Sequence, residues 1–167
     1  FVRRVARPAA WGVALLMGLG AAGAWLDVLR FMNQTPFGAI DPVFGRDISF
    51  YVFSLPVLEI VGSGMLLSLG IALLAAAAMY FLKGALLLTN KGVSAERPAA
   101  VHLAVLGSPL FLVLAFNTFV GMHAVLTSAQ GLVAGATYTD VHARLPAMKL
   151  QIALAVVVSG SGLATAL

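Results

Sequence analysis

Four long runs of apolar residues divide the chain, and the charged residues all lie outside these runs. The runs cover residues 9–26, 60–82, 103–126 and 150–167. Each has about the length that an α-helix needs to cross roughly 30 Å of hydrocarbon. None alternates between apolar and polar residues as the strands of a membrane barrel do. Because a chain in lipid must satisfy its backbone hydrogen bonds internally, the pattern predicts spanning helices.

The predicted fold class is an all-α membrane protein with four transmembrane helices and short interfacial helices in the extracytoplasmic connections. With their flanking residues, the predicted spans cover about residues 9–29, 57–82, 100–126 and 147–167. We expect residues 1–167 to form a single transmembrane helical bundle. Because the chain begins at Phe1 and stops inside an apolar run, we also expect it to be a fragment of a longer chain.

Composition favours lipid over water as the surroundings of this chain. Apolar residues make up 61% of it and charged residues 10%, with a mean hydropathy of +1.02. A soluble domain usually carries about a quarter charged residues. The net charge of +4 comes from basic residues scattered beside apolar runs. This distribution suits a membrane surface and offers no basic and aromatic surface for nucleic acid.

The distribution of Lys and Arg sets the expected orientation. Residues 1–8 contain three basic residues and residues 83–98 contain three. Residues 27–59 and 127–149 contain two each, spread over longer connections. Because cytoplasmic connections are enriched in Lys and Arg, we place residues 1–8 and 83–98 in the cytoplasm.

The outer connection over residues 27–59 is rich in aromatic residues and turn formers. Aromatic rings beside polar groups suit the lipid–water boundary, so we expect residues 37–55 to be ordered along the membrane. Ser54 is the expected N-cap of the second span, since Pro56 fits its first turn. In the other outer connection, Asp140 and Arg144 have the i,i+4 spacing of a helical ion pair.

These outer connections also carry a family resemblance. The segments TPFGAIDPVFGRDISFYVFSLP (residues 35–56) and GATYTDVHARLPAMK (residues 135–149) resemble two signatures of a bacterial family, uncharacterised protein family 0182. The segment RVARPAAWGVALL at residues 4–16 is similar to the span that precedes them.

The resemblance implies about seven spanning helices followed by a large extracytoplasmic domain. This chain would then cover roughly the third to sixth spans, in a multi-pass protein of the bacterial inner (plasma) membrane. It departs from the family in extent, since the first spans, the last span and the large domain have no counterpart here. The family has no established activity that the resemblance could carry over.

Small residues recur every four positions along the second predicted span. They are Gly64, Ser68, Ala72 and Ala76. A stripe of this kind lets another helix approach closely. We expect the stripe to pack against another helix of the same chain, and packing against another subunit is the alternative.

Asn117 and Pro109 mark the third predicted span as a candidate intramembrane polar site. Proline removes a helical hydrogen bond and obstructs the carbonyl of Val105, which predicts a kink. Asn117 has no reason to face lipid, so an interhelical hydrogen bond is its expected role. In the alternative, both residues line a polar path, as the broken helices of transporters do.

Asp41, Arg46 and Asp47 form the densest cluster of charges. Their carboxylate oxygens would suit a hard cation such as calcium. An arginine between two carboxylates instead favours a local network of ion pairs and turns. We therefore assign these residues, with Asp140 and Arg144, to an extracytoplasmic structural cluster and predict no metal site.

No motif predicts catalysis or a cofactor. The GxGxxG pattern at residues 18–23 lies inside a predicted span, without the preceding strand that a dinucleotide site needs. No catalytic triad, pair of buried carboxylates or phosphate loop stands out. We expect neither an enzyme activity nor a bound cofactor.

The sequence favours a scaffold or anchor subunit of a larger membrane assembly. The expected partners are the lipid bilayer and either other membrane subunits or the rest of the same chain, with no nucleic acid. The apolar runs contain no Asp, Glu, Lys or Arg, so they lack the ionisable relay of a proton-coupled pump. The alternative is a transporter or channel module with a polar path near a kinked third span.

Overall fold

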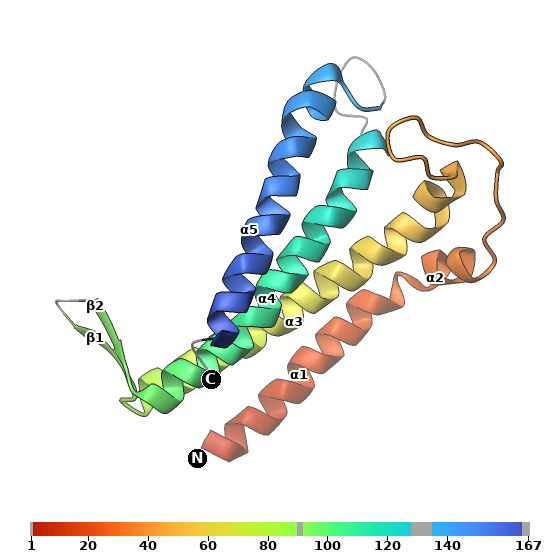
Figure 1. Cartoon of the computed structure of the whole chain (residues 1–167). Coiled ribbons are helices and arrows are strands. Elements are labelled where there is room, and N and C mark those ends of the chain that lie inside the picture. The colour runs from red at the N-terminus through yellow and green to blue at the C-terminus, as the bar shows by residue number, and fades with distance from the viewer. Residues whose placement is uncertain (1, 90–91, 128–134, 165–167) are drawn as a thin grey trace. The chain divides into compact units, whose positions relative to one another are not determined.

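The computed structural model describes residues 2–89, 92–127 and 135–164 (Figure 1). The chain divides into two compact units, Phe1–Ile60 and Val61–Leu167, and the boundary falls inside a long helix. That all four predicted spans pack as one bundle stays a prediction.

Three described helical stretches are long and apolar enough to cross a membrane. They are Phe50–Leu82, Arg97–Thr127 and Asp140–Ala164, which contain 18-residue windows with mean hydropathies of 2.2, 2.1 and 1.5. A fourth is the bent pair Ala10–Ala22 and Trp25–Met32, if the two helices are counted as one span. The predicted long apolar helices are therefore present, and their insertion in a membrane stays a prediction.

The first unit begins with α1 (Val2–Ala22) and α2 (Trp25–Met32), which meet at an angle of 55°. The predicted span over residues 9–29 is divided between these two helices, because the helix breaks at Gly23. Glycine weakens a helix through the backbone freedom that it must give up. Beyond the break, Asp27 and Arg30 form an ion pair of 3.5 Å between exposed side chains.

The second long helix begins earlier than Ser54, its predicted N-cap. A π-helical turn, η1 (Phe50–Ser54), runs directly into α3 (Leu55–Leu82). Ser54 lies inside this turn, where its hydroxyl donates to the side-chain oxygen of Gln34 at 3.0 Å. The prediction of Ser54 as the N-cap was therefore wrong.

A β-hairpin joins α3 to the next helix, which the all-α prediction missed. Gly84, with a φ of 72°, ends α3, and the amide of Ala85 donates to the carbonyl of Tyr80. This is the usual glycine-dependent helix end. Strands β1 (Leu86–Thr89) and β2 (Gly92–Ala95) then pair in antiparallel register.

The second unit is built mainly on α4 (Arg97–Ala124) and α5 (Leu145–Ala164), which run side by side (Figure 1). Between them lie the 3₁₀ turn η2 (Val125–Thr127) and the π-helical turn η3 (Asp140–Arg144). Helix α4 continues through Pro109 without a break in its helical conformation.

Small residues hold α4 and α5 close together. The Ser159 hydroxyl donates to the backbone carbonyl of Ser108 at 2.8 Å, and both serines are 2% exposed. A Cβ atom built on Gly162 would lie 2.6 Å from the Ser108 hydroxyl oxygen. Small side chains of this kind let helix backbones approach closely in membrane bundles.

Polar contacts join helix α3 to α4 toward each end of the pair. The Tyr80 hydroxyl lies 3.0 Å from Nδ1 of His102. The Asn117 side-chain amide donates to the backbone carbonyl of Gly62 at 3.0 Å. A Cβ atom on Gly62 would collide with the Asn117 side-chain oxygen. Gly62 is therefore the glycine that the contact between α3 and α4 requires.

The predicted stripe on α3 does not make this contact. A Cβ atom on Gly64 would meet no atom within 4 Å. Ser68 and Ala72 are exposed, while Ala76 is half-buried. Because Gly62 and Gly64 are about 200° apart around a helix, they lie on different faces. Gly62 therefore makes the close contact with α4, and packing of the stripe against another helix or another subunit stays a prediction.

Substitution of each glycine by alanine separates the two faces of α3. We expect Gly62→Ala to destabilise the protein by about 1–3 kcal/mol relative to Gly64→Ala, because only the first methyl group overlaps a neighbouring side chain. Both substitutions have a similar intrinsic effect on helix propensity, so Gly64→Ala is the control. Thermal denaturation of the purified protein in detergent measures the difference. Equal midpoints would contradict the role of Gly62.

Candidate functional site

The first candidate site is the turn over residues 37–51, which is organised around the carboxylate of Asp41. The Asp41 residue is buried, with 8% of its surface exposed. Its carboxylate accepts hydrogen bonds from the amides of Val43, Phe44 and Arg46 at 2.8, 2.7 and 2.9 Å. The hydroxyl of Tyr51 donates a fourth bond at 2.8 Å. The Asp41 side chain thus ties the turn to the beginning of the long helix.

Asp47 fixes the other side of the same turn. Its carboxylate accepts hydrogen bonds from the amides of Phe37, Gly38 and Ser49 at 3.1, 2.8 and 2.8 Å. An antiparallel bridge pairs Asp47 with Ile40 across the turn. Gly38 has a φ of 74°, which an L side chain would disfavour.

Arg46 does not join the two carboxylates as predicted. Its guanidinium lies 4.5 Å from the centre of the Phe50 ring, which is a cation–π contact. The carboxylates of Asp41 and Asp47 bind backbone amides instead. The predicted ion-pair network was wrong, because converging amides satisfy the carboxylate oxygens locally. The turn itself was predicted correctly.

These hydrogen bonds lower the pKa of both carboxyl groups. Burial acts to raise the pKa of Asp41, but the bonds from Phe44, Arg46, Tyr51 and Val43 outweigh it and lower the value from 3.8 to about 2. The hydroxyl and amide of Ser49, followed by the amide of Phe37, lower the pKa of Asp47 from 3.8 to about 2. Hydrogen bonds favour the charged form of a carboxyl group.

Few carboxylate oxygens of the turn remain available to bind a cation. Among the described residues, no group of three or more His, Asp or Glu side chains could hold a metal ion. The oxygens of Asp41 and Asp47 already accept hydrogen bonds from the protein. The chemistry available here is structural, since the carboxylates order the backbone.

The second outer connection has a smaller cluster of its own. Arg144 and Asp140 form the predicted ion pair at 3.5 Å. The Asp140 carboxylate also accepts from the amide and hydroxyl of Thr137 at 3.0 and 2.8 Å. Tyr138 stacks on His142 with ring centres 4.0 Å apart. Asp140 and Arg144 belong to the second unit, whereas Asp41, Arg46 and Asp47 belong to the first. The predicted cluster is therefore two separate groups of contacts.

Polar side chains within the long helices bind nearby backbone atoms. Asn117 forms the interhelical bond to Gly62 that was its expected role. His123 is 3% exposed, and its Nδ1 lies 2.9 Å from the carbonyl of Phe119. The Ser108 hydroxyl donates to the carbonyl of Ala104 at 2.9 Å. In the part of the chain that the structure describes, no buried side-chain nitrogen or oxygen lacks a hydrogen-bond partner.

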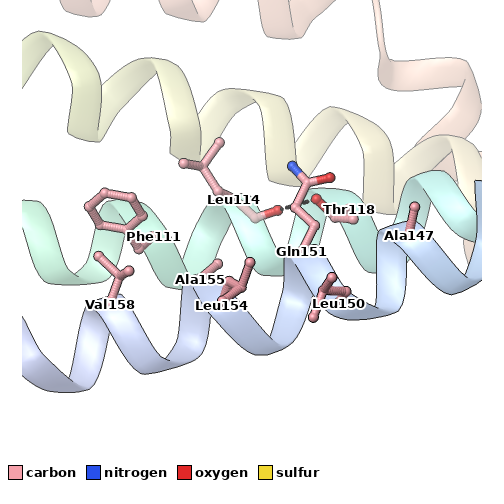
Figure 2. A pocket seen from close by; sticks show the side chains of 9 residues that line it. All are labelled: Phe111, Leu114, Thr118, Ala147, Leu150, Gln151, Leu154, Ala155 and Val158. Carbon is pink, nitrogen blue, oxygen red and sulfur yellow. Dashed lines mark hydrogen bonds between the residues drawn. The ribbon is translucent and has the colours of Figure 1, made fainter.

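Sequence reasoning missed a groove between α4 and α5. The groove has a volume of about 350 Å³, and its lining is shown in Figure 2. It is lined by Phe111, Leu114, Thr118, Ala147, Leu150, Gln151, Leu154, Ala155 and Val158. The signal in the sequence was Gln151, an amide one residue into the fourth apolar run.

The fold defines a helical protein with three helices, or four with the bent pair, that are apolar enough to span a membrane. The chain belongs to the uncharacterised protein family UPF0182, whose family model matches residues 2–167. This confirms the resemblance carried by the segments at residues 35–56 and 135–149.

Curated relatives in several bacteria are similar to this chain. A UPF0182 protein of Cupriavidus necator is 37% identical over 143 residues, which cover 86% of this chain and 16% of the relative. One from Paenarthrobacter aurescens is 39% identical over 140 residues, covering 81% and 14%. One from Bradyrhizobium diazoefficiens is 37% identical over 151 residues, covering 90% and 16%. No solved structure matches the chain.

The lowered pKa values predict how the turn responds to acid. Because the folded pKa of Asp41 and Asp47 is about 2 and the ordinary value is 3.8, their contribution to stability is complete above pH 4. It is lost as the pH falls toward 2. Carbon-13 spectra of labelled aspartate should give midpoints near 2 in the folded protein and near 3.8 in a peptide of residues 35–51. Midpoints near 3.8 in both would refute the hydrogen-bonded turn.

Proposed function

We propose that this chain is an integral membrane scaffold or anchor subunit of a larger assembly, with no activity of its own. One observation carries the proposal: the apolar faces of the long helices are uncovered. The stretch Phe50–Leu82 is the most apolar, and no residue of its most apolar 18-residue window is buried. Large side chains such as Leu74 are strongly exposed, at 71%.

This exposure is too unfavourable for an isolated protein in water. Burial of apolar surface contributes about 25 cal/mol per Å², so a long helix with an uncovered apolar surface needs lipid or protein around it. Lipid tails can cover such a helix without any specific contact. The hydrogen-bonded backbone of each long helix is compatible with this environment.

The placement of polar groups favours a scaffold over a transporter. Asn117 donates to Gly62, and Ser159 donates to Ser108, so each joins two helices. A polar path needs groups that remain available to a hydrated substrate or ion. The transporter or channel alternative requires water to reach Asn117 and the backbone beside Pro109.

The proposed location is the bacterial inner membrane, with residues 1–8 and 83–98 in the cytoplasm. The excess of basic residues in these two segments supports this orientation. In the second unit, the β-hairpin lies at the ends of α3 and α4, and η3 lies at the start of α5. The hairpin and η3 would then face opposite sides of the bilayer.

The proposed partners are the lipid bilayer and either other membrane subunits or further parts of the same protein. The chain covers 14% to 16% of the length of the three relatives described above. In proteins of that size, a helical unit with ordered outer turns is suited to hold other parts in place. The turn over residues 37–51 is the part best suited to present a fixed surface.

The topology can be tested with single cysteines, because this chain contains no native cysteine. We expect Ser94→Cys in the hairpin and Ala143→Cys in η3 to react with an impermeant maleimide from opposite sides of sealed membrane vesicles. Both positions are exposed. Alkaline carbonate should leave the protein in the membrane. Release by carbonate, or labelling of both positions from one side, would refute the proposed insertion.

A cysteine at Asn117 distinguishes the scaffold from the transporter. We expect Asn117→Cys to remain unlabelled under conditions that label Ser94→Cys completely, since Asn117 packs against Gly62. Loss of the interhelical hydrogen bond should lower stability by about 1 kcal/mol, the usual size of such bonds in lipid. Rapid labelling at position 117 would instead support a hydrated path and the transporter alternative.

A further inference from the structure

The groove between α4 and α5 contains two polar side chains among apolar ones. Figure 2 shows the Gln151 side chain among apolar side chains of both helices. Thr118 is the other polar lining residue, and its hydroxyl already donates to the carbonyl of Leu114 at 2.9 Å. Among the described residues, none bonds to the Gln151 amide. The amide is therefore free to bind an occupant of the groove.

From Gln151 toward Val158, the groove is lined by apolar side chains. Gln151 lies seven residues before Val158, which is about 10 Å along the helix axis. Phe111 and Val158 line the far end of the groove, and Leu154 lies between that end and Gln151. An occupant that matches this lining has a hydrogen-bonding group at one end and a hydrocarbon chain at the other.

Lys149 indicates the depth of the polar end. It is exposed and precedes Gln151 by two residues, or about 3 Å along the axis. A lysine near the end of a spanning helix extends its ammonium group to the membrane surface. Gln151 then lies just below the headgroups, where the ester carbonyls of phospholipids lie. An unpaired amide at this depth is unfavourable unless an acceptor reaches it.

The size of the groove favours a lipid chain over another helix. Its volume of about 350 Å³ falls within the range of about 300–1,000 Å³ typical of small-molecule sites. A helix with its side chains is about 10–12 Å wide and would contact much more than one narrow groove.

We propose that this groove binds one acyl chain of a glycerophospholipid from the outer leaflet. The Gln151 amide donates to the ester carbonyl, and the chain lies along Leu154 toward Phe111 and Val158. The site rests on the proposed membrane insertion, since it takes its lipid from the bilayer.

The test compares lipid retention by three variants of the protein as it occurs in its membrane. Each is reconstituted into nanodiscs of phosphatidylethanolamine and phosphatidylglycerol, released in the mass spectrometer and analysed for bound lipid. We expect wild type to retain one phospholipid per chain. Leu154→Trp should fill the groove and abolish retention, while Gln151→Leu should reduce it at least several-fold by removing the donor.

Val157→Trp is the matched control. Val157 is 67% exposed on the same helix as Leu154, which is 57% exposed, but it does not line the groove. Retention should match wild type in this variant. Equal retention by Leu154→Trp and Val157→Trp would refute the site. Disulfide or chemical crosslinking of Leu154→Cys to another protein segment would also refute it, because a helix would then occupy the groove.

The failure of this proposal can be told apart from the failure of membrane insertion. If alkaline carbonate releases the protein, the proposed function fails and the lipid site fails with it. If the protein stays in the membrane but wild type retains no phospholipid, only the lipid site fails.

Discussion

The close approach of α4 and α5 at Ser108 is the contact on which the second unit depends. Ser108, Ser159 and Gly162 are small enough for the helices to meet, and a hydroxyl–carbonyl hydrogen bond joins them there. In the proposed lipid environment no hydrophobic force drives helices together, so packing and hydrogen bonds would hold this pair. The same pairing places the side chains of both helices around the groove.

The Asp41 turn gives a physical reason for one of the two segments that carry the family resemblance. The stretch over residues 35–56 contains both aspartates, two glycines with positive φ and the tyrosine that together order the turn. Each aspartate acts as an acceptor for several backbone amides. A sequence segment that folds around such acceptors specifies the shape of the backbone more than it specifies any reaction.

The sequence predicted the long helices well, because lipid leaves a chain few ways to satisfy its backbone. It predicted the ends of the helices poorly. Gly23 breaks the first helix, and Phe50 begins the second through a π-helical turn, neither of which changes the apolar pattern. The hairpin at β1 and β2 was missed because residues 83–98 were judged only by their basic residues, as a cytoplasmic connection.

The candidate site was harder to predict than the fold, because it depends on which face of a helix meets which neighbour. A four-residue repeat identified Gly64, whereas the contact with Asn117 uses Gly62 on another face. The pattern of small residues shows their spacing along α3, but it does not show which face of α3 meets a neighbouring helix. Gln151 was overlooked for a similar reason, since only the pairing of α4 with α5 places its amide in a groove.

The contact between Gly62 and Asn117 places different requirements on the residues at the two positions. The acceptor is a main-chain carbonyl, which every amino acid supplies, so position 62 is limited only by size. The donor is a side chain, so position 117 is limited by chemistry and reach. Alanine at 62 would therefore be compatible with a shorter donor such as serine at 117. The two positions are expected to vary together during evolution, even though only one of them contributes a functional group.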